Sequence, residues 1–123
     1  MEIIETSKAP AAIGPYSQAA VAAGLVFVSG QLPIDPATGN MPADAGSAAD
    51  QSLKNIAAIL EAKGLTMANV IKVNIFLKDM ADFAAVNEVY ARHFTAPFPA
   101  RACVAVAGLP KDAVVEIECV AAL

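Results

Sequence analysis

The sequence contains no tryptophan, and aromatic residues make up only 6% of its 123 residues. Hydrophobic residues nevertheless account for 57% of the chain, and many of them are alanine. A chain of this length builds one hydrophobic core, so we expect residues 1–123 to form a single domain. Because large side chains are scarce, burial must come from Val, Ile and Leu, from close backbone approach, or from a partner chain.

Positive charge is also sparse, with 8 Lys and Arg residues against 12 Asp and Glu and a formal net charge of −4. Nucleic-acid backbones require clustered cations, so the composition argues against a nucleic-acid partner. No apolar run reaches the roughly 20 residues of a membrane-spanning helix, and residues 1–10 lack the apolar segment of a signal peptide. We therefore expect a cytoplasmic protein with no membrane partner.

The chain has only two cysteines, Cys103 and Cys119, and one histidine, His93. Both cysteines lie in apolar segments, which predicts buried thiols and not a disulfide framework, and no spacing suggests a zinc site. His93 falls near the end of a predicted helix, where it is expected on the surface and where a positive charge suits the helix dipole. Since nothing places it near Cys103, a Cys–His catalytic pair has little support. Glycine-rich phosphate loops and metalloprotease motifs are absent.

Hydrophobic periodicity predicts an α+β domain of order ββαβαββ, with two helices on one face of a mixed sheet. A turn at Ala23-Gly24 joins the first two strands, and Ser47 with Asp50 three residues later resembles a capping box at the start of the first helix. Gly64 is expected to stop that helix. The strands are expected at 16–22, 25–29, 70–77, 102–107 and 114–121, and the second helix is expected to run from about residue 82 until Pro97 and Pro99 end it.

Two helices can cover only one face of a sheet, yet residues 26–28 and 104–107 are apolar at consecutive positions. Side chains alternate between the faces of a strand, so these segments are apolar on both faces. The simplest cover for the second face is another copy of the chain. A monomer is therefore not expected.

Charged residues inside apolar strands are the candidates for chemistry, since an unpartnered buried charge is costly. Arg101 and Cys103 share one face of their strand, and Glu116 and Glu118 share one face of the last strand. Arg101 could bind a substrate carboxylate through two hydrogen bonds, or form a salt bridge to Glu116 or Glu118. Glu118 could activate a water molecule or be the partner in that bridge. The residues alone leave both alternatives open and favour the salt bridge.

Two further residues near strand ends allow a functional or a structural interpretation. Tyr16 follows Gly14-Pro15 and could anchor a strand or offer its hydroxyl to a pocket. Gly30 ends the next strand, where a free backbone N–H could contact a ligand, or where the glycine could simply allow a turn.

Several segments resemble those of the RidA (YjgF) family, and the similarity extends over nearly the whole chain. Joint occurrence of the Gly-Pro-Tyr, Ser-Gly-Gln and Pro-Ala-Arg-x-Cys elements makes the resemblance specific. The matching segments are 9–18, 29–33, 35–39, 51–55, 73–79, 83–87, 98–103, 109–112 and 116–118.

This resemblance implies a chorismate-mutase-like fold assembled as a homotrimer, with three clefts between subunits. It implies hydrolysis of 2-iminobutanoate and 2-iminopropanoate to 2-oxo acids and ammonia, which detoxifies products of pyridoxal-phosphate dehydratases. It implies no cofactor and no metal of the protein's own. By position, Arg101 matches the carboxylate-binding arginine, Glu118 the water-activating glutamate, and Cys103 a residue that acts through its backbone N–H. The other matched site residues are Tyr16, Gly30 and Asn87.

The alternative is a non-catalytic member of the same family, either a regulator that binds small acids or a chaperone-like holdase. RNA cleavage has also been attached to such proteins, but the acidic composition and the lone His93 argue against it here. Arg101 separates the two main interpretations, because a deaminase depends on it and a holdase does not.

Overall fold

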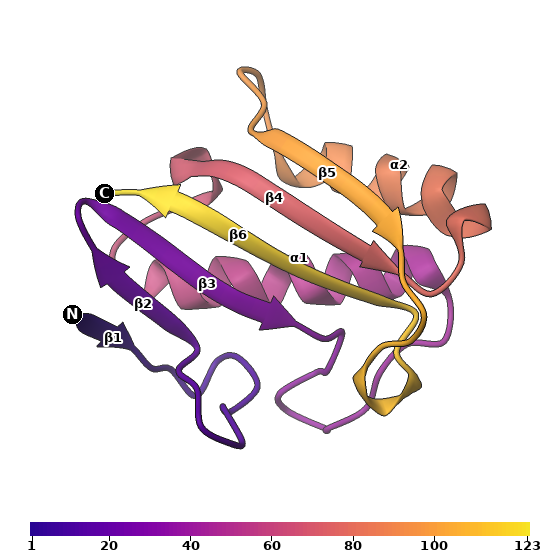
Figure 1. Ribbon diagram of the computed structural model, residues 1–123, viewed down its shortest axis with the longest axis horizontal. Coiled ribbons are helices and arrows are strands. Elements are labelled where there is room, and N and C mark those ends of the chain that lie inside the picture. Colours follow the sequence, from indigo (N-terminus) through magenta and orange to yellow (C-terminus); the bar gives the residue numbers. More distant parts are fainter.

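A six-stranded sheet with two helices packed on one of its faces makes up the fold (Figure 1), which a computed structural model describes for all residues, 1–123. The α+β class and the placement of both helices on one face are as expected. Short 3-10 turns occupy Met67–Asn69, Met80–Asp82 and Pro110–Asp112. The main elements are β1 (Glu2–Ile4), β2 (Ala19–Ala22), β3 (Leu25–Gln31), α1 (Ala45–Glu61), β4 (Val70–Leu77), α2 (Phe83–His93), β5 (Ala100–Ala105) and β6 (Val115–Ala122).

The strands are arranged in the order β1-β2-β3-β6-β4-β5. All neighbours are antiparallel except β4 and β5, which are parallel and joined through α2. The mixed sheet is therefore confirmed. The expected order ββαβαββ is wrong in omitting β1, a three-residue strand in which only Ile4 is buried. A strand this short has no alternation by which the sequence could reveal it.

Local sequence explains where several elements begin and end. Ala23 and Gly24 both have positive φ angles, 53° and 75°, as a two-residue turn between β2 and β3 requires. The strand expected at 16–22 begins only at Ala19, because Tyr16 lies in a turn in which its N–H donates to the Gly14 carbonyl at 2.9 Å. The strand expected at 102–107 begins and ends two residues earlier, as β5.

Helix α1 begins before the position that the sequence predicts. Asp44 is its N-cap and accepts a hydrogen bond from the Ser47 N–H at 2.9 Å. Ser47 therefore lies inside the first turn, and the expected Ser47/Asp50 capping box is wrong. Both Asp44 and Ser47 are good N-cap residues, so the local pattern could not decide between them. Gly64, with φ of 77°, lies just beyond the helix end as expected.

The hydrophobic core lies between the sheet and α1, with α2 closing one end of it. On α1, Leu53, Ile56 and Leu60 are almost completely buried. Burying a side chain of this size contributes about 1.5–3 kcal/mol. On α2, Val86 and Tyr90 are buried. Neither helix is both long and apolar enough to span a bilayer.

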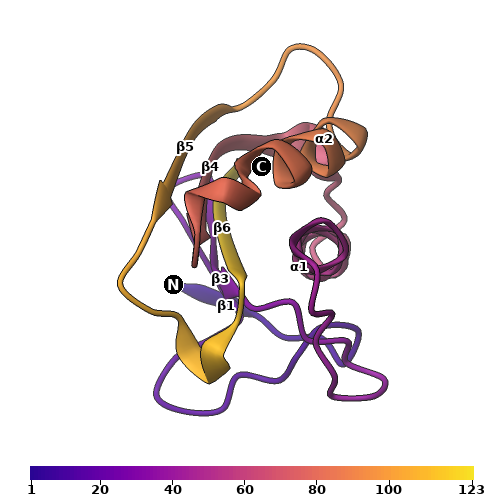
Figure 2. The ribbon, with the colours of Figure 1, turned by 90° about the vertical axis from the view of Figure 1, so that its right-hand side faces the viewer.

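The sheet face that points away from both helices, called the open face below, is bare within one chain (Figure 2). Its side chains are largely apolar, and Phe27 and Val104 are 48% and 47% exposed. The neighbours of Phe27 on β3, Val26 and Val28, are buried on the other face. Apolar character on both faces of β3 is thus confirmed, while the oligomer that it predicts remains a prediction.

Candidate active site

Arg101 and Cys103 lie on the helix-facing side of the edge strand β5. They are in register with Val73 and Ile75 of β4, which are buried in the core. This confirms that the two residues share a face. One Arg101 guanidinium nitrogen, Nη1, donates to Oδ1 of Asn87 at 2.7 Å. The structure thus brings three of the matched site residues into one cluster.

Aromatic rings fix the position of the Arg101 guanidinium. Its central carbon lies 4.7 Å from the ring centroid of Tyr90 and 5.7 Å from that of Phe83. Such cation–π contacts favour a charge held over the ring face. Tyr90 in turn packs against Phe94, with centroids 4.6 Å apart. The arginine is therefore ordered although its side chain is exposed.

No carboxylate of the chain pairs with Arg101. The ion pairs of the structure join other residues, and neither Glu116 nor Glu118 reaches the guanidinium. The salt bridge that the residues alone favoured is therefore wrong within one chain. An ordered, exposed arginine without a carboxylate partner is suited to bind a carboxylate from solution.

Cys103 is half-buried and packs against the core. Burial raises the pKa of its thiol, and the nearby charge of Arg101 opposes that rise only in part. A thiol with a raised pKa is protonated at neutral pH and is a poor nucleophile. Cys119 is buried and also free, so the absence of a disulfide is as predicted.

His93 does not approach either cysteine, and the expectation that it lies on the helix surface is wrong. Its side chain is 16% exposed, and Nε2 lies 2.7 Å from Oδ1 of Asp50. The pair links α2 to α1. Asp50 also forms an ion pair with Lys54 at 3.0 Å. Burial opposes ionisation of Asp50, but its hydrogen bonds to His93 and Lys54 leave its pKa lowered overall.

Glu118 lies on the open face, on the opposite side of the sheet from Arg101. Its register partner on β4 is Asn74, whose Nδ2 donates to Glu118 Oε2 at 3.0 Å. Ile117 and Cys119, on either side of it in β6, point into the core. The structure therefore does not bring Arg101 and Glu118 together within one chain.

Gly30 lies beside Glu118 at an irregularity in β3. The register pairs Val28 with Cys119 and Gln31 with Ile117, which leaves Ser29 and Gly30 opposite Glu118. A Cβ atom on Gly30 would stand 2.7 Å from Oε1 of Glu116. The absence of a side chain at Gly30 leaves room for the Glu116 carboxylate. Gly30, Glu116 and Glu118 thus form a second cluster on the open face.

Tyr16 stands apart from both clusters and is 54% exposed. It lines a cavity of about 530 Å³ between β1 and the segment that follows it. Gln18 fixes this segment, since its side-chain amide donates to the carbonyls of Thr6 at 3.0 Å and Pro10 at 2.7 Å. Gln18 is buried, and sequence reasoning missed it.

Two other residues of the site were also missed from the sequence, namely Asn74 and Tyr90. Asn74 is an amide in the middle of an apolar strand, a pattern that could have marked it as a partner for a charged group. Tyr90 was not among the candidate site residues. Its hydroxyl is buried without a hydrogen-bond partner, and burial raises its pKa, with Arg101 opposing the rise. No group of three or more His, Cys, Asp or Glu side chains is placed to hold a metal ion.

Comparison with known proteins matches residues 6–123 to the family described as Endoribonuclease L-PSP. A RutC family protein of Haemophilus influenzae is 55% identical over 124 residues, which cover 98% of this chain and 95% of that protein. The 2-iminobutanoate/2-iminopropanoate deaminase of Escherichia coli strain K12 is 50% identical over 121 residues, or 96% and 94% of the two chains. The crystal structure of Escherichia coli TdcF with bound serine superposes with a TM-score of 0.95 at 47% identity, covering 100% of this chain and 99% of that one.

Proposed function

This chain belongs to the Endoribonuclease L-PSP family, the RidA (YjgF) family that its motifs resemble, and on that premise we propose that it hydrolyses 2-iminobutanoate and 2-iminopropanoate to 2-oxo acids and ammonia. The single observation that carries this proposal is the ordered Arg101, which has no carboxylate partner in its own chain. The name of the Escherichia coli relative supports the choice of substrates. Pyridoxal-phosphate dehydratases release such imines, and this chain removes them.

Arg101 holds the substrate by its carboxylate. The planar guanidinium matches a carboxylate with two parallel hydrogen bonds, which a lysine ammonium cannot form. Asn87 and the rings of Tyr90 and Phe83 fix the guanidinium before the substrate arrives. Pre-ordering of this kind reduces the entropy lost on binding.

Glu118 acts on the water. A protonated imine is already a good electrophile, so the enzyme has only to place a water molecule and remove its proton as the oxygen attacks. Asn74 holds the Glu118 carboxylate for this role. The backbone N–H groups of Cys103 and Gly30 contact the ligand or the water. No thiol chemistry is required, in agreement with the raised pKa of Cys103.

The complete site is shared between subunits of a homotrimer. Arg101 and Glu118 lie on opposite faces of one sheet, so the carboxylate-binding arginine of one copy works with the base of another. The open face supports the assembly, because exposed apolar side chains such as Phe27 and Val104 gain free energy when another copy covers them. Tyr16 and its cavity contribute to the cleft.

RNA cleavage, which the family description names, is not proposed. His93 is the only histidine of the chain and is bonded to Asp50 between the two helices. The net charge of −4 offers no cationic surface for a phosphate backbone.

A trapping assay tests the proposed reaction. Threonine dehydratase generates 2-iminobutanoate in the presence of semicarbazide, and semicarbazone formation is followed by absorbance. The protein is expected to lower the semicarbazone yield in proportion to its concentration, and the Arg101→Ala variant is expected not to do so. An unchanged yield, with 2-oxobutanoate still bound in calorimetry, would contradict the reaction and favour the acid-binding regulator.

A further inference from the structure

Helix α2 carries the groups that hold Arg101, although few contacts hold α2 itself. Asn87 accepts the hydrogen bond from the guanidinium, and the ring centroid of Tyr90 lies 4.7 Å from the guanidinium carbon. Only Val86 and Tyr90 of this 11-residue helix are buried, and its N-terminus has no side-chain cap. An isolated helix of this length is marginal in water. Contacts with the rest of the chain must therefore keep α2, and with it the Arg101 contacts, in place.

Two side-chain hydrogen bonds join α2 to other elements. One is the Asn87–Arg101 bond of the site, and the other runs between His93 Nε2 and Asp50 Oδ1 at 2.7 Å. A further side-chain bond stays within the helix. The bond between His93 and Asp50 is thus the only one of its kind that fixes α2 independently of Arg101.

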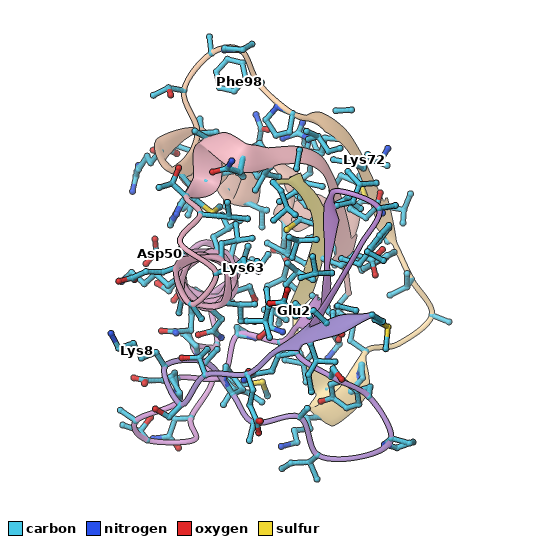
Figure 3. All side chains as sticks on the ribbon, turned by 90° about the vertical axis from the view of Figure 1, so that its left-hand side faces the viewer. Glu2, Lys8, Asp50, Lys63, Lys72 and Phe98 are labelled. Atoms are coloured by element: carbon cyan, nitrogen blue, oxygen red, sulfur yellow. The ribbon has the colours of Figure 1, made fainter.

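The His93–Asp50 bond lies in the contact between the two helices, which are side by side on the sheet (Figure 2). Asp50 is on the flank of α1 that does not face the sheet (Figure 3). One turn earlier on each helix, Gly46 faces Val89, and a Cβ atom on Gly46 would lie 3.6 Å from Cγ2 of Val89. The helix contact therefore combines a small residue, which lets the helices approach, with a hydrogen bond one turn further on.

On its other side, the C-terminal end of α2 borders a cavity of about 340 Å³. His93 and Phe94 line the cavity from the helix end, and Pro97 and Pro99 line it from the segment that leads into β5. Side chains therefore do not fill the space between this helix end and the strand that carries the guanidinium. Packing on that side does not replace the bond to α1.

The Asp50 carboxylate is suited to accept a strong hydrogen bond. Burial opposes its ionisation, but the bonds to His93 and Lys54 lower its pKa overall. An ionised acceptor makes a hydrogen bond about twice as strong as a neutral one. Lys54 belongs to α1 and forms its ion pair with Asp50 within that helix, at 3.0 Å. Of these two partners of Asp50, only His93 reaches another helix.

We propose that His93 and Asp50 are positioning residues for Arg101, since their bond fixes the C-terminal end of α2 on α1. Asn87 and Tyr90 then stay where they hold the guanidinium. The proposal rests on the carboxylate-binding role proposed for Arg101 above. When the bond is removed, α2 leaves its place in a larger fraction of the molecules, and those molecules bind a carboxylate less well. The apparent Kd rises as the binding-competent fraction falls.

Binding of 2-oxobutanoate, measured by calorimetry, tests the role of the bond. His93→Phe keeps a ring and removes the donor, so Kd should rise by about 2- to 10-fold, the factor that one hydrogen bond contributes to an equilibrium constant. His93→Gln keeps an N–H donor and should bind with nearly the parent Kd. In steady-state kinetics, KM should rise with Kd while kcat stays near that of the parent, because the proposed base Glu118 is not on α2.

Two ion pairs next to the bond supply matched controls. Lys54→Gln removes the other partner of Asp50. Arg92→Gln removes the pair between Arg92 and Glu88, beside His93 on α2. Each pair lies within one helix and does not join the two, so neither variant should change Kd.

Two double variants show whether the bond acts as a unit and whether it acts through Arg101. Asp50→Ala removes the acceptor, so it should raise Kd as much as His93→Phe does, and the double variant should be no worse than either single one. Asn87→Ala removes the amide that α2 offers to the guanidinium. In that background, His93→Phe should raise Kd by less than it does in the parent, because coupled residues are not additive.

The failure of this proposal and that of the proposed function give different results. A parent protein that binds 2-oxobutanoate without accelerating imine hydrolysis would overturn the proposed function alone, and Kd would still report on the bond. A parent that does not bind the acid would overturn the positioning role together with the carboxylate-binding role of Arg101.

The variants decide the positioning role itself, each checked for folding by circular dichroism. An unchanged Kd in His93→Phe would overturn it, as would a His93→Gln Kd no better than that of His93→Phe. An equal rise in Lys54→Gln would also overturn it, since the effect would then come from the charge around Asp50 and not from the bond between the helices. Should His93→Phe not fold, Asp50→Ala decides, and a Kd equal to that of the parent would refute the role.

Discussion

The ring of Tyr90, and not its hydroxyl, should determine how well Arg101 binds a carboxylate. The guanidinium carbon lies 4.7 Å from the ring centroid, whereas the hydroxyl is buried and bonded to nothing. Cation–π contacts contribute about 0.5–2 kcal/mol. At 1.4 kcal/mol for each factor of ten, the substitution Tyr90→Leu should raise KM and the Kd of 2-oxobutanoate by roughly 2- to 30-fold. The chemical step lies at Glu118, so kcat should change little.

Tyr90→Phe is the matched variant, because it keeps the ring and removes only the unpartnered hydroxyl. Its KM should equal that of the parent. Removing a buried, unsatisfied polar group should also increase the free energy of unfolding by about 1 kcal/mol, measured in urea at one fixed protein concentration. Calorimetry with 2-oxobutanoate and steady-state kinetics give the binding values.

Val86→Ala provides the control for general damage to α2, since Val86 is buried on the same helix face and offers the guanidinium neither an aromatic ring nor a hydrogen bond. It should lower stability without changing KM. If Tyr90→Phe weakened product binding as much as Tyr90→Leu, the hydroxyl would be the functional group and the cation–π argument would be refuted.

Much of the fold could be predicted because it depends on local periodicity. Alternation in β5 correctly placed Arg101 and Cys103 on one face, and alternation in β6 separated Glu116 and Glu118 from the core. Strand β4 was predicted at its observed limits. Local chemistry was less decisive where two patterns compete, as at the start of α1, where Asp44 and not Ser47 is the cap.

The site depended on information that local patterns do not contain. Asn74 meets Glu118 across 44 positions of sequence, and His93 meets Asp50 across 43. Such partners follow from strand register and helix packing, which long-range contacts decide. For the same reason, the sequence could suggest a bridge between Arg101 and Glu118, although the pairing of β6, β4 and β5 places them on opposite faces of the sheet.

Three of the remaining predictions concern single side chains. Cys103→Ala should retain most imine hydrolysis in the trapping assay, because alanine keeps the backbone N–H; loss of activity with an intact fold would identify the thiol as the nucleophile. Glu118→Gln should lower kcat by about 10²–10⁴ while the Kd of 2-oxobutanoate is kept, and a wild-type rate would remove Glu118 from the mechanism. Asp50 has a lowered pKa, so its ionised form stabilises the fold above the unfolded value of about 4. Asp50→Asn should therefore unfold more easily than the parent at pH 7 in urea, and the difference should close as pH falls below about 4. The last concerns assembly, because Phe27 projects from the open face of β3 and is 48% exposed. Phe27→Glu would place an unpaired charge in the proposed interface, where such a charge costs several kcal/mol, so sedimentation should give a smaller mass than for the parent. Imine hydrolysis should be lost with the assembly, since Arg101 and Glu118 of one chain cannot meet; a parent that itself sediments at 12.6 kDa, or a dissociated variant that remains active, would show that the site is not shared.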